Sequence, residues 1–128
     1  MSRVVGRGWA TVDLARAEAE LLDRARVGDF EDAERSSWLG ARCRRARVID
    51  AETSDGGWIV VLEPDSEGRL AAFLARHGEG WAVTWSTDEA ADTISVPRAG
   101  PLGPEVLGPG QPTSGPFRLL QPAATIEP

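Results

Sequence analysis

The sequence of 128 residues contains no lysine, no tyrosine and a single cysteine, Cys43. A lone cysteine allows neither an internal disulfide nor a two-cysteine metal motif, so we expect a reducing, cytoplasmic setting. No apolar run approaches the roughly 20 residues that span a bilayer, and the N-terminus has no apolar stretch of signal-peptide length. We therefore expect no membrane partner. The net charge of −6 also argues against nucleic-acid partners.

The apolar content of 41% is that of a globular chain, and the length suits one domain with its own core. Residues 97–116 hold six prolines and five glycines, so we expect them to form a flap over a binding site rather than long strands. Residues 29–37 are acidic and polar and predict a loop. The remaining patterns predict strands over 4–12, 38–50, 58–63, 81–87 and 117–122, and helices over 14–26 and 67–77.

An apolar strand, WIVVLE, ends on the carboxylate Glu63, and the next strand carries Trp81 and Trp85. The residues alone leave two interpretations open. Glu63 is either a solvated strand end or a functional carboxylate, and the tryptophans are either core residues or a platform for a ligand. Four nearby arginines predict an exposed strand face, from which one could point inward and clamp an acid group. They are Arg42, Arg44, Arg45 and Arg47.

The string LEP…GRLAAFLARHGEGWAVTW, together with ATVDLARA at 10–17, resembles the vicinal oxygen chelate superfamily. This superfamily includes glyoxalase I, methylmalonyl-CoA epimerase, extradiol dioxygenases and bleomycin-resistance proteins, and the motif is closest to the epimerase-like members. The resemblance implies an α+β fold in which two paired β-α-β-β-β modules form a cupped sheet within one domain, and a homodimer. The first module would cover about 1–64, a connecting helix about 65–79, and a degenerate second module about 80–122.

Metal-dependent members of this superfamily carry four ligands, one on each of four strands. Carried over one residue at a time, those positions fall at Gly6, Glu63, Val83 (or Ala82) and Gln121. Only Glu63 keeps a ligand of the family pattern. The resemblance therefore implies that the metal site is absent, and we expect no other cofactor.

Alternation along the strands then predicts an apolar, aromatic cup in place of the metal site. We expect the cup to bind and sequester a hydrophobic or aromatic small molecule without metal, in the manner of antibiotic-resistance proteins. A cationic antibiotic is one such ligand. The alternative is a metal-independent isomerase or cyclase of natural-product biosynthesis, with Glu63 as general base. The expected ligand-binding residues are Gly6, Gly8, Ile59, Val61, Glu63, Trp81, Val83, Trp85, Phe117, Leu119 and Gln121.

Overall fold

The computed structural model describes residues 3–24, 27–49, 57–88, 98–107 and 117–122. These residues form one mixed sheet of seven strands, in the order β2-β3-β4-β1-β5-β7-β6, together with two helices. The predicted α+β class is confirmed. The elements are β1 (Arg3–Ala10), α1 (Leu14–Arg24), β2 (Glu31–Ser36), β3 (Ala41–Arg47), β4 (Trp58–Pro64), α2 (Arg69–His77), β5 (Gly80–Asp88), β6 (Val106–Leu107) and β7 (Phe117–Pro122).

The sheet has two halves that meet between β1 and β5, which run antiparallel. In the first half β1 lies parallel to β4, and β4, β3 and β2 follow as antiparallel neighbours. In the second half β5 lies parallel to β7, and β6 pairs antiparallel with β7. The same parallel-then-antiparallel order thus runs outward from the β1–β5 junction on both sides.

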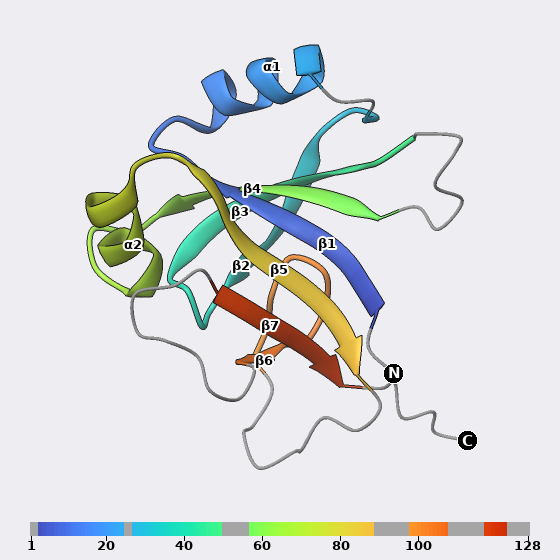
Figure 1. Ribbon diagram of the computed structural model, residues 1–128, viewed down its shortest axis with the longest axis vertical. Helices are drawn as coiled ribbons and strands as arrows, with labels where there is room; N and C mark the ends of the chain where they lie inside the picture. The colour runs from blue at the N-terminus through green and yellow to red at the C-terminus, as the bar shows by residue number, and fades with distance from the viewer. Residues whose placement is uncertain (1–2, 25–26, 50–56, 89–97, 108–116, 123–128) are drawn as a thin grey trace.

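Helix α1 covers one face of the sheet, which we call the outer face. Its apolar stripe places Ala17 and Leu21 against Ile59 and Val61 of β4. The helix begins where the sequence predicts, because Asp13 accepts a hydrogen bond at Oδ1 from a first-turn amide, 3.1 Å away. Figure 1 shows α1 above the sheet and α2 beside one end of it.

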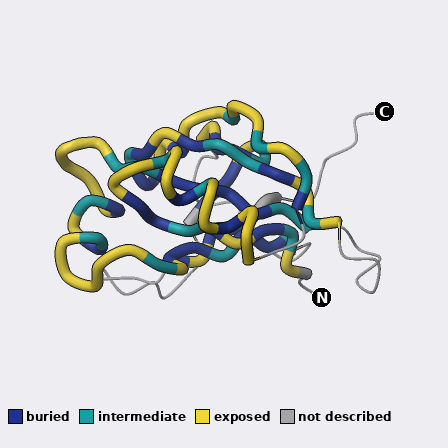
Figure 2. The backbone as a smooth tube through the Cα atoms, turned by 90° about the horizontal axis from the view of Figure 1, so that it is seen from above, coloured by how far each residue is buried: buried dark blue, intermediate teal, exposed yellow. Residues whose placement is uncertain are grey.

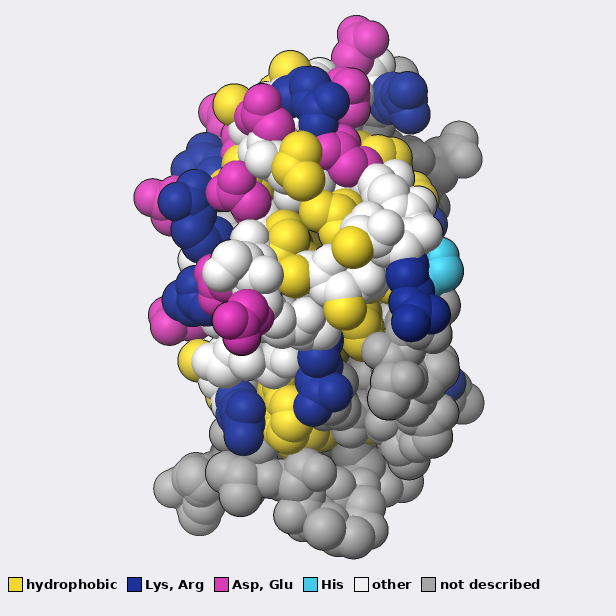
Figure 3. Space-filling model, turned by 90° about the vertical axis from the view of Figure 1, so that its left-hand side faces the viewer, with side chains coloured by type: hydrophobic (Ala, Val, Ile, Leu, Met, Phe, Trp, Pro, Cys, Tyr) yellow, Lys and Arg dark blue, Asp and Glu magenta, His cyan; other side chains and the backbone are white. Residues whose placement is uncertain are grey.

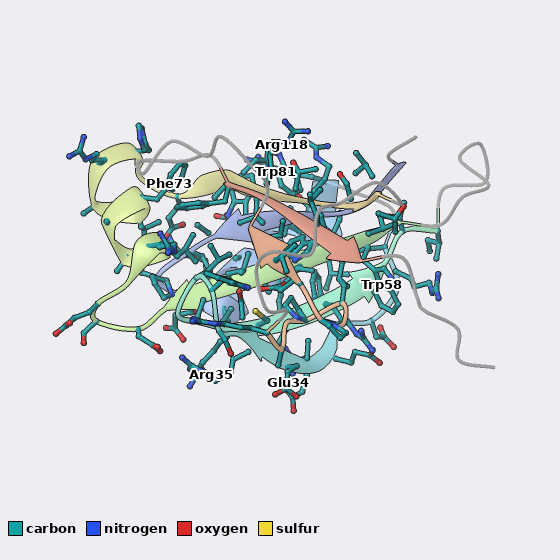
Figure 4. All side chains as sticks on the ribbon, turned by 90° about the horizontal axis from the view of Figure 1, so that it is seen from below. Glu34, Arg35, Trp58, Phe73, Trp81 and Arg118 are labelled. Atoms are coloured by element: carbon teal, nitrogen blue, oxygen red, sulfur yellow. The ribbon has the colours of Figure 1, made fainter. Side chains whose placement is uncertain are left out.

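The opposite, inner face holds the larger core. Side chains of β4, β5 and β7 pack there with Leu70 and Phe73 of α2, which closes one end of this face. Residues 98–107 turn back on themselves through reciprocal backbone bonds between Arg98 and Glu105, of 2.9 and 2.8 Å, and we call them the inner hairpin. Seen from below in Figure 4, the inner hairpin lies on the side of the sheet away from α1. Figure 2 shows that burial concentrates in the strands and that exposure concentrates in the helix surfaces and connections.

Two predictions about elements need correction or restriction. Residues 29–37 are not a loop, because β2 forms the edge of the sheet within them. Four of its six residues are exposed, so the strand lacks the alternating apolar pattern that would have marked it. Of the predicted flap, only 98–107 lies within the described residues, and its mobility stays a prediction. The described residues contain no helix with the length and apolar character needed to cross a membrane.

Candidate functional site

A fully buried carboxylate, Glu105, lies on the inner face where separate parts of the chain meet. Its Oε1 accepts a hydrogen bond from Trp85 Nε1 at 2.8 Å, and its Oε2 accepts one from Ser36 Oγ at 2.8 Å. Its backbone oxygen accepts a third bond, from Trp38 Nε1, also at 2.8 Å. Strand β5, the end of β2 and the turn after β2 therefore all hold the inner hairpin at this residue.

Burial makes this carboxyl a weaker acid than an ordinary glutamate side chain. The loss of hydration raises the pKa of Glu105 from 4.5 to about 7, although the hydrogen bonds from Trp85 and Ser36 oppose the rise. A carboxyl group with a pKa near neutrality is populated in both protonation states under physiological conditions. It can therefore both take a proton from a substrate and return it.

Cys43 is the other inner-face group whose acidity is shifted. Burial raises the pKa of its thiol to about 12, so it stays protonated at neutral pH. Its Sγ lies 3.7 Å from the backbone oxygen of Ala41, within the apolar core of the inner face. Cys43 is thus a small buried core residue, and it does not serve as a second proton-transfer group beside Glu105.

Glycines of β1 create the room in which the inner face packs. A Cβ on Gly8 would lie 2.7 Å from Leu62 Cδ1 and 2.9 Å from Trp85 Cζ3. A Cβ on Gly6 would lie 2.6 Å from Leu102 Cδ1 of the inner hairpin. These glycines leave space as the sequence analysis expects, but the protein's own side chains occupy it.

The structure brings only part of the predicted cup together. Val83, Trp85, Phe117 and Leu119 share the inner face and are buried in one core. Gln121 pairs through its backbone with the end of β5, and its side chain lies outside the described residues.

Four other predicted cup residues lie on the outer face, so the assignment of faces was wrong for them. Ile59 and Val61 pack against α1, and Glu63 shares their side of β4 by strand alternation. Trp81 departs from the simple pattern because the pairing of β1 with β5 shifts register between Gly8 and Trp9. A bulge of this kind turns the side chains beyond it to the other face.

Trp81 is therefore part of a different cluster from Trp85. Its ring meets that of Trp9 edge-on at 5.1 Å, and the Arg7 guanidinium lies over it at 4.4 Å. Trp81 is 39% exposed, whereas Trp85 is fully buried. The two tryptophans do not form a shared platform for a flat ligand.

Glu63 lies at an open groove of about 720 Å³ between the start of α1 and strands β2 to β4. It forms an ion pair with Arg42 at 3.1 Å, and Arg44 binds both Glu18 and Asp32 at 2.6 Å. Figure 3, in which the left-hand side of Figure 1 faces the viewer, shows acidic and basic side chains interleaved over the upper part of the molecule. The charges of this outer groove are mutually compensated, as is usual for solvated surface pairs.

The inner face does not fit the metal site of the resemblance. Of the four positions that the resemblance implies, Gly6 and Val83 lie on this face and have no side-chain metal donor, and the side chain of Gln121 lies outside the described residues. Glu63, the one ligand that the resemblance retains, is on the other face. Within the described part of the chain, no three His, Cys, Asp or Glu residues gather as a metal site.

Sequence reasoning gave Glu105 no role. It is a single carboxylate in PLGPEVLG, a stretch in which prolines and glycines suggest an exposed loop. Its only sequence signal is its place directly before the apolar pair Val106 and Leu107.

No protein-family model and no curated protein sequence matches the chain. Among solved structures, a variant of Streptomyces coelicolor methylmalonyl-CoA epimerase with bound 2-nitronate-propionyl-CoA aligns with a TM-score of 0.72 at 18% identity, covering 96% of this chain and 98% of that one. The Mycobacterium tuberculosis methylmalonyl-CoA epimerase aligns with a TM-score of 0.65 at 18% identity, covering 94% and 87%. The chain has the vicinal oxygen chelate fold. A methylmalonyl-CoA epimerase in complex with methylmalonyl-CoA and NH4+ aligns with a TM-score of 0.72 at 20% identity, covering 100% and 99%.

The neighbours contradict the expectation of antibiotic sequestration, because they are epimerases with bound CoA compounds rather than drug-binding proteins. Packing also removes the basis of that expectation. The two tryptophans of the expected cup lie on different faces and form no stacking platform for an aromatic ligand. The compounds bound by these neighbours agree with a small-molecule ligand and give no support to a hydrophobic or cationic antibiotic. The predicted homodimer stays a prediction.

Proposed function

We propose that this protein is a metal-independent isomerase that moves one proton within a small carbonyl compound. Glu105 is the acid–base group, in place of the Glu63 of our sequence-based alternative. The observation that carries the proposal is a buried carboxyl on the inner face with a pKa of about 7 and two oriented hydrogen-bond partners. The epimerase neighbours support the same class of chemistry through a shared fold.

The reaction needs one base and no redox partner. Ionised Glu105 takes a proton from a carbon beside the carbonyl group, and the C–H electron pair forms an enolate. Protonated Glu105 then returns the proton to the substrate at a different position or on a different face, which regenerates the carboxylate. Because the pKa of Glu105 is about 7, neither direction of proton transfer is strongly opposed by the base.

Trp85 and Ser36 have a defined part in this cycle. Their N–H and O–H groups donate to the two carboxylate oxygens and so fix the direction in which the base points. When the proton passes to Glu105, negative charge moves from the carboxylate to the substrate oxygen. Trp85 and Ser36 each have a single N–H or O–H to donate, and the carboxyl oxygens of Glu105 accept both, so the two residues position the base.

The substrate reaches Glu105 by displacing part of the inner hairpin. Leu102 fills the hollow above Gly6, and the hairpin is held by Arg45 Nη1 to the Pro101 oxygen at 2.8 Å and Ser37 N to the Ala99 oxygen at 3.1 Å. Movement of Leu102 out of that hollow opens apolar space beside the buried carboxyl. Closure in the free protein keeps water from Glu105, which sustains the raised pKa.

The test is exchange of substrate protons with D2O, followed by proton NMR. A panel of carbonyl acids and thioesters that includes methylmalonyl-CoA is incubated with the protein in the presence of EDTA. We expect exchange of the proton beside the carbonyl with at least one member of the panel. Glu105→Gln, which keeps the shape and the acceptor for Trp85, should slow it about a hundredfold or more.

Glu63→Gln is the matched control, because it removes the same charge from the outer face. It should leave the exchange rate unchanged. Equal loss of exchange in both variants, or full exchange in Glu105→Gln, refutes the role given to Glu105. Exchange that occurs only in a parallel reaction without EDTA refutes metal independence.

A further inference from the structure

Two arginines lie against one tryptophan at the end of the inner face opposite α2. The guanidinium carbons of Arg45 and Arg47 lie 4.4 and 4.5 Å from the ring centroid of Trp58. Figure 4 places Trp58 at the opposite end of the sheet from Phe73, a buried residue of α2. We call Arg45, Arg47 and Trp58 the rim cluster.

The strand register puts the rim cluster on the inner face. Arg47 pairs with Trp58 across β3 and β4, and Trp58 pairs in turn with Gly6 on β1. A Cβ on Gly6 would meet both Trp58 Cβ, at 3.5 Å, and Leu102. The rim cluster therefore borders the hollow through which the substrate enters.

The rim cluster is also joined to the hairpin that carries the base. Arg45 donates through Nε to Glu31 Oε2 and through Nη1 to the Pro101 oxygen, both at 2.8 Å. These bonds use two of the five N–H groups of a guanidinium. Arg45 can therefore bind a further acceptor at the rim while it keeps its hold on the hairpin.

We propose that the rim cluster binds a negatively charged group of the substrate, a carboxylate or a phosphate. This inference rests on the proposed function and names its substrate class: a carbonyl compound that carries an anionic group away from the reacting carbon. Planar guanidinium groups match the geometry of both anions, and hydrogen bonds to charged groups are the stronger kind. The Trp58 ring holds the arginines in place and supplies an apolar surface beside the anion.

The first test measures binding without any reaction. Inorganic phosphate and malonate are titrated separately into labelled protein, and the indole N–H signals are followed by NMR, with Trp58→Phe to assign the Trp58 signal. We expect a saturable shift of that signal with one or both anions and none with malonamide, the neutral analogue of malonate. The anion that binds more tightly shows whether the site prefers phosphate or carboxylate.

Arg47→Gln should weaken the binding about tenfold, as loss of a charge-assisted hydrogen bond does. Arg76→Gln is the control, because it removes an exposed arginine from the far end of α2 and should leave binding unchanged. Unchanged affinity in Arg47→Gln, or an equal loss in both variants, overturns the proposed subsite. Thermal unfolding of both variants checks that they remain folded.

The second test separates this inference from the proposed function. For a substrate found by proton exchange, Arg47→Gln should raise KM and leave kcat unchanged. With the wild-type protein, an uncharged ester of that substrate should also have a raised KM and an unchanged kcat. Anion binding at Trp58 without exchange in any carbonyl acid would support the subsite and reject Glu105 as the base. If the KM for proton exchange changes neither in Arg47→Gln nor with the uncharged ester, the subsite is rejected and the role of Glu105 is not.

Discussion

Replacement of Glu105 by Gln should change how the stability of the protein depends on pH. The unfolded chain ionises this carboxyl with a pKa of 4.5, whereas burial raises the folded pKa to about 7. Between these values the folded state binds the proton and the unfolded state does not, so ionisation of Glu105 destabilises the protein as pH rises. A difference from 4.5 to about 7 corresponds to about 3 kcal/mol of stability.

This stabilisation is fully present below about pH 4.5 and is lost as pH rises through about 7. Glu105→Gln has no proton to lose, and its amide oxygen still accepts from Trp85. We therefore expect the free energy of unfolding of wild type, relative to the variant, to fall by about 3 kcal/mol between pH 4 and pH 8.

The assay is urea unfolding of wild type and Glu105→Gln across that pH range, monitored by tryptophan fluorescence. All other titrating groups are shared, so the difference between the two proteins isolates Glu105. Glu63→Gln serves as the control for removal of a carboxylate from the outer face. A difference between wild type and Glu105→Gln that stays constant from pH 4 to pH 8 would refute the reasoning.

Two further substitutions test the packing on which the site depends. Gly8→Ala places a methyl group against Leu62 and Trp85. Overpacking of this kind should lower the free energy of unfolding, measured by urea titration, by about 1–3 kcal/mol. An unchanged free energy of unfolding would contradict the tight contact. Asp13→Ala removes the cap that accepts from the amide of Arg16 and should lower stability by about 1 kcal/mol in the same assay, whereas Asp13→Asn should retain most of it.

The sequence predicted the elements with strong periodic patterns. Helix α1, strand β4, helix α2 and strand β5 follow apolar spacing and glycine signals that local physics sets, and the structure has them within a few residues. Gly78 ends α2 at a φ of 79°, as its position after the apolar stripe predicts. Strand β2 was missed because an exposed edge strand needs no apolar alternation.

The faces of the strands were harder to predict than the strands. Alternation correctly placed the inner residues of β5 and β7, but it failed at Trp81 because one register shift beside Trp9 turns this end of β5 to the other face. On β4 both faces are buried, so Ile59 and Val61 look no different in sequence from Val60 and Leu62. Only the packing of α1 decides which pair is outer.

Local sequence patterns could not identify the carboxylate that we propose as the base. Glu105 has a raised pKa because it is buried, at a point where it meets Trp85 and Ser36, which are 20 and 69 positions away in the chain. No spacing rule connects such residues in a single sequence. Glu63, which the strand pattern marked clearly, is an ion-paired residue at the outer groove.

The measurement that tests the account most directly is the pH dependence of proton exchange catalysed by the wild-type protein. With a carbonyl acid as substrate and EDTA present, the exchange rate should rise with pH and level off, with its midpoint at the pKa of about 7 that burial gives Glu105. Glu105→Gln should abolish this rise. A midpoint near the ordinary carboxyl pKa of 4.5, or exchange that persists in Glu105→Gln, would contradict the account.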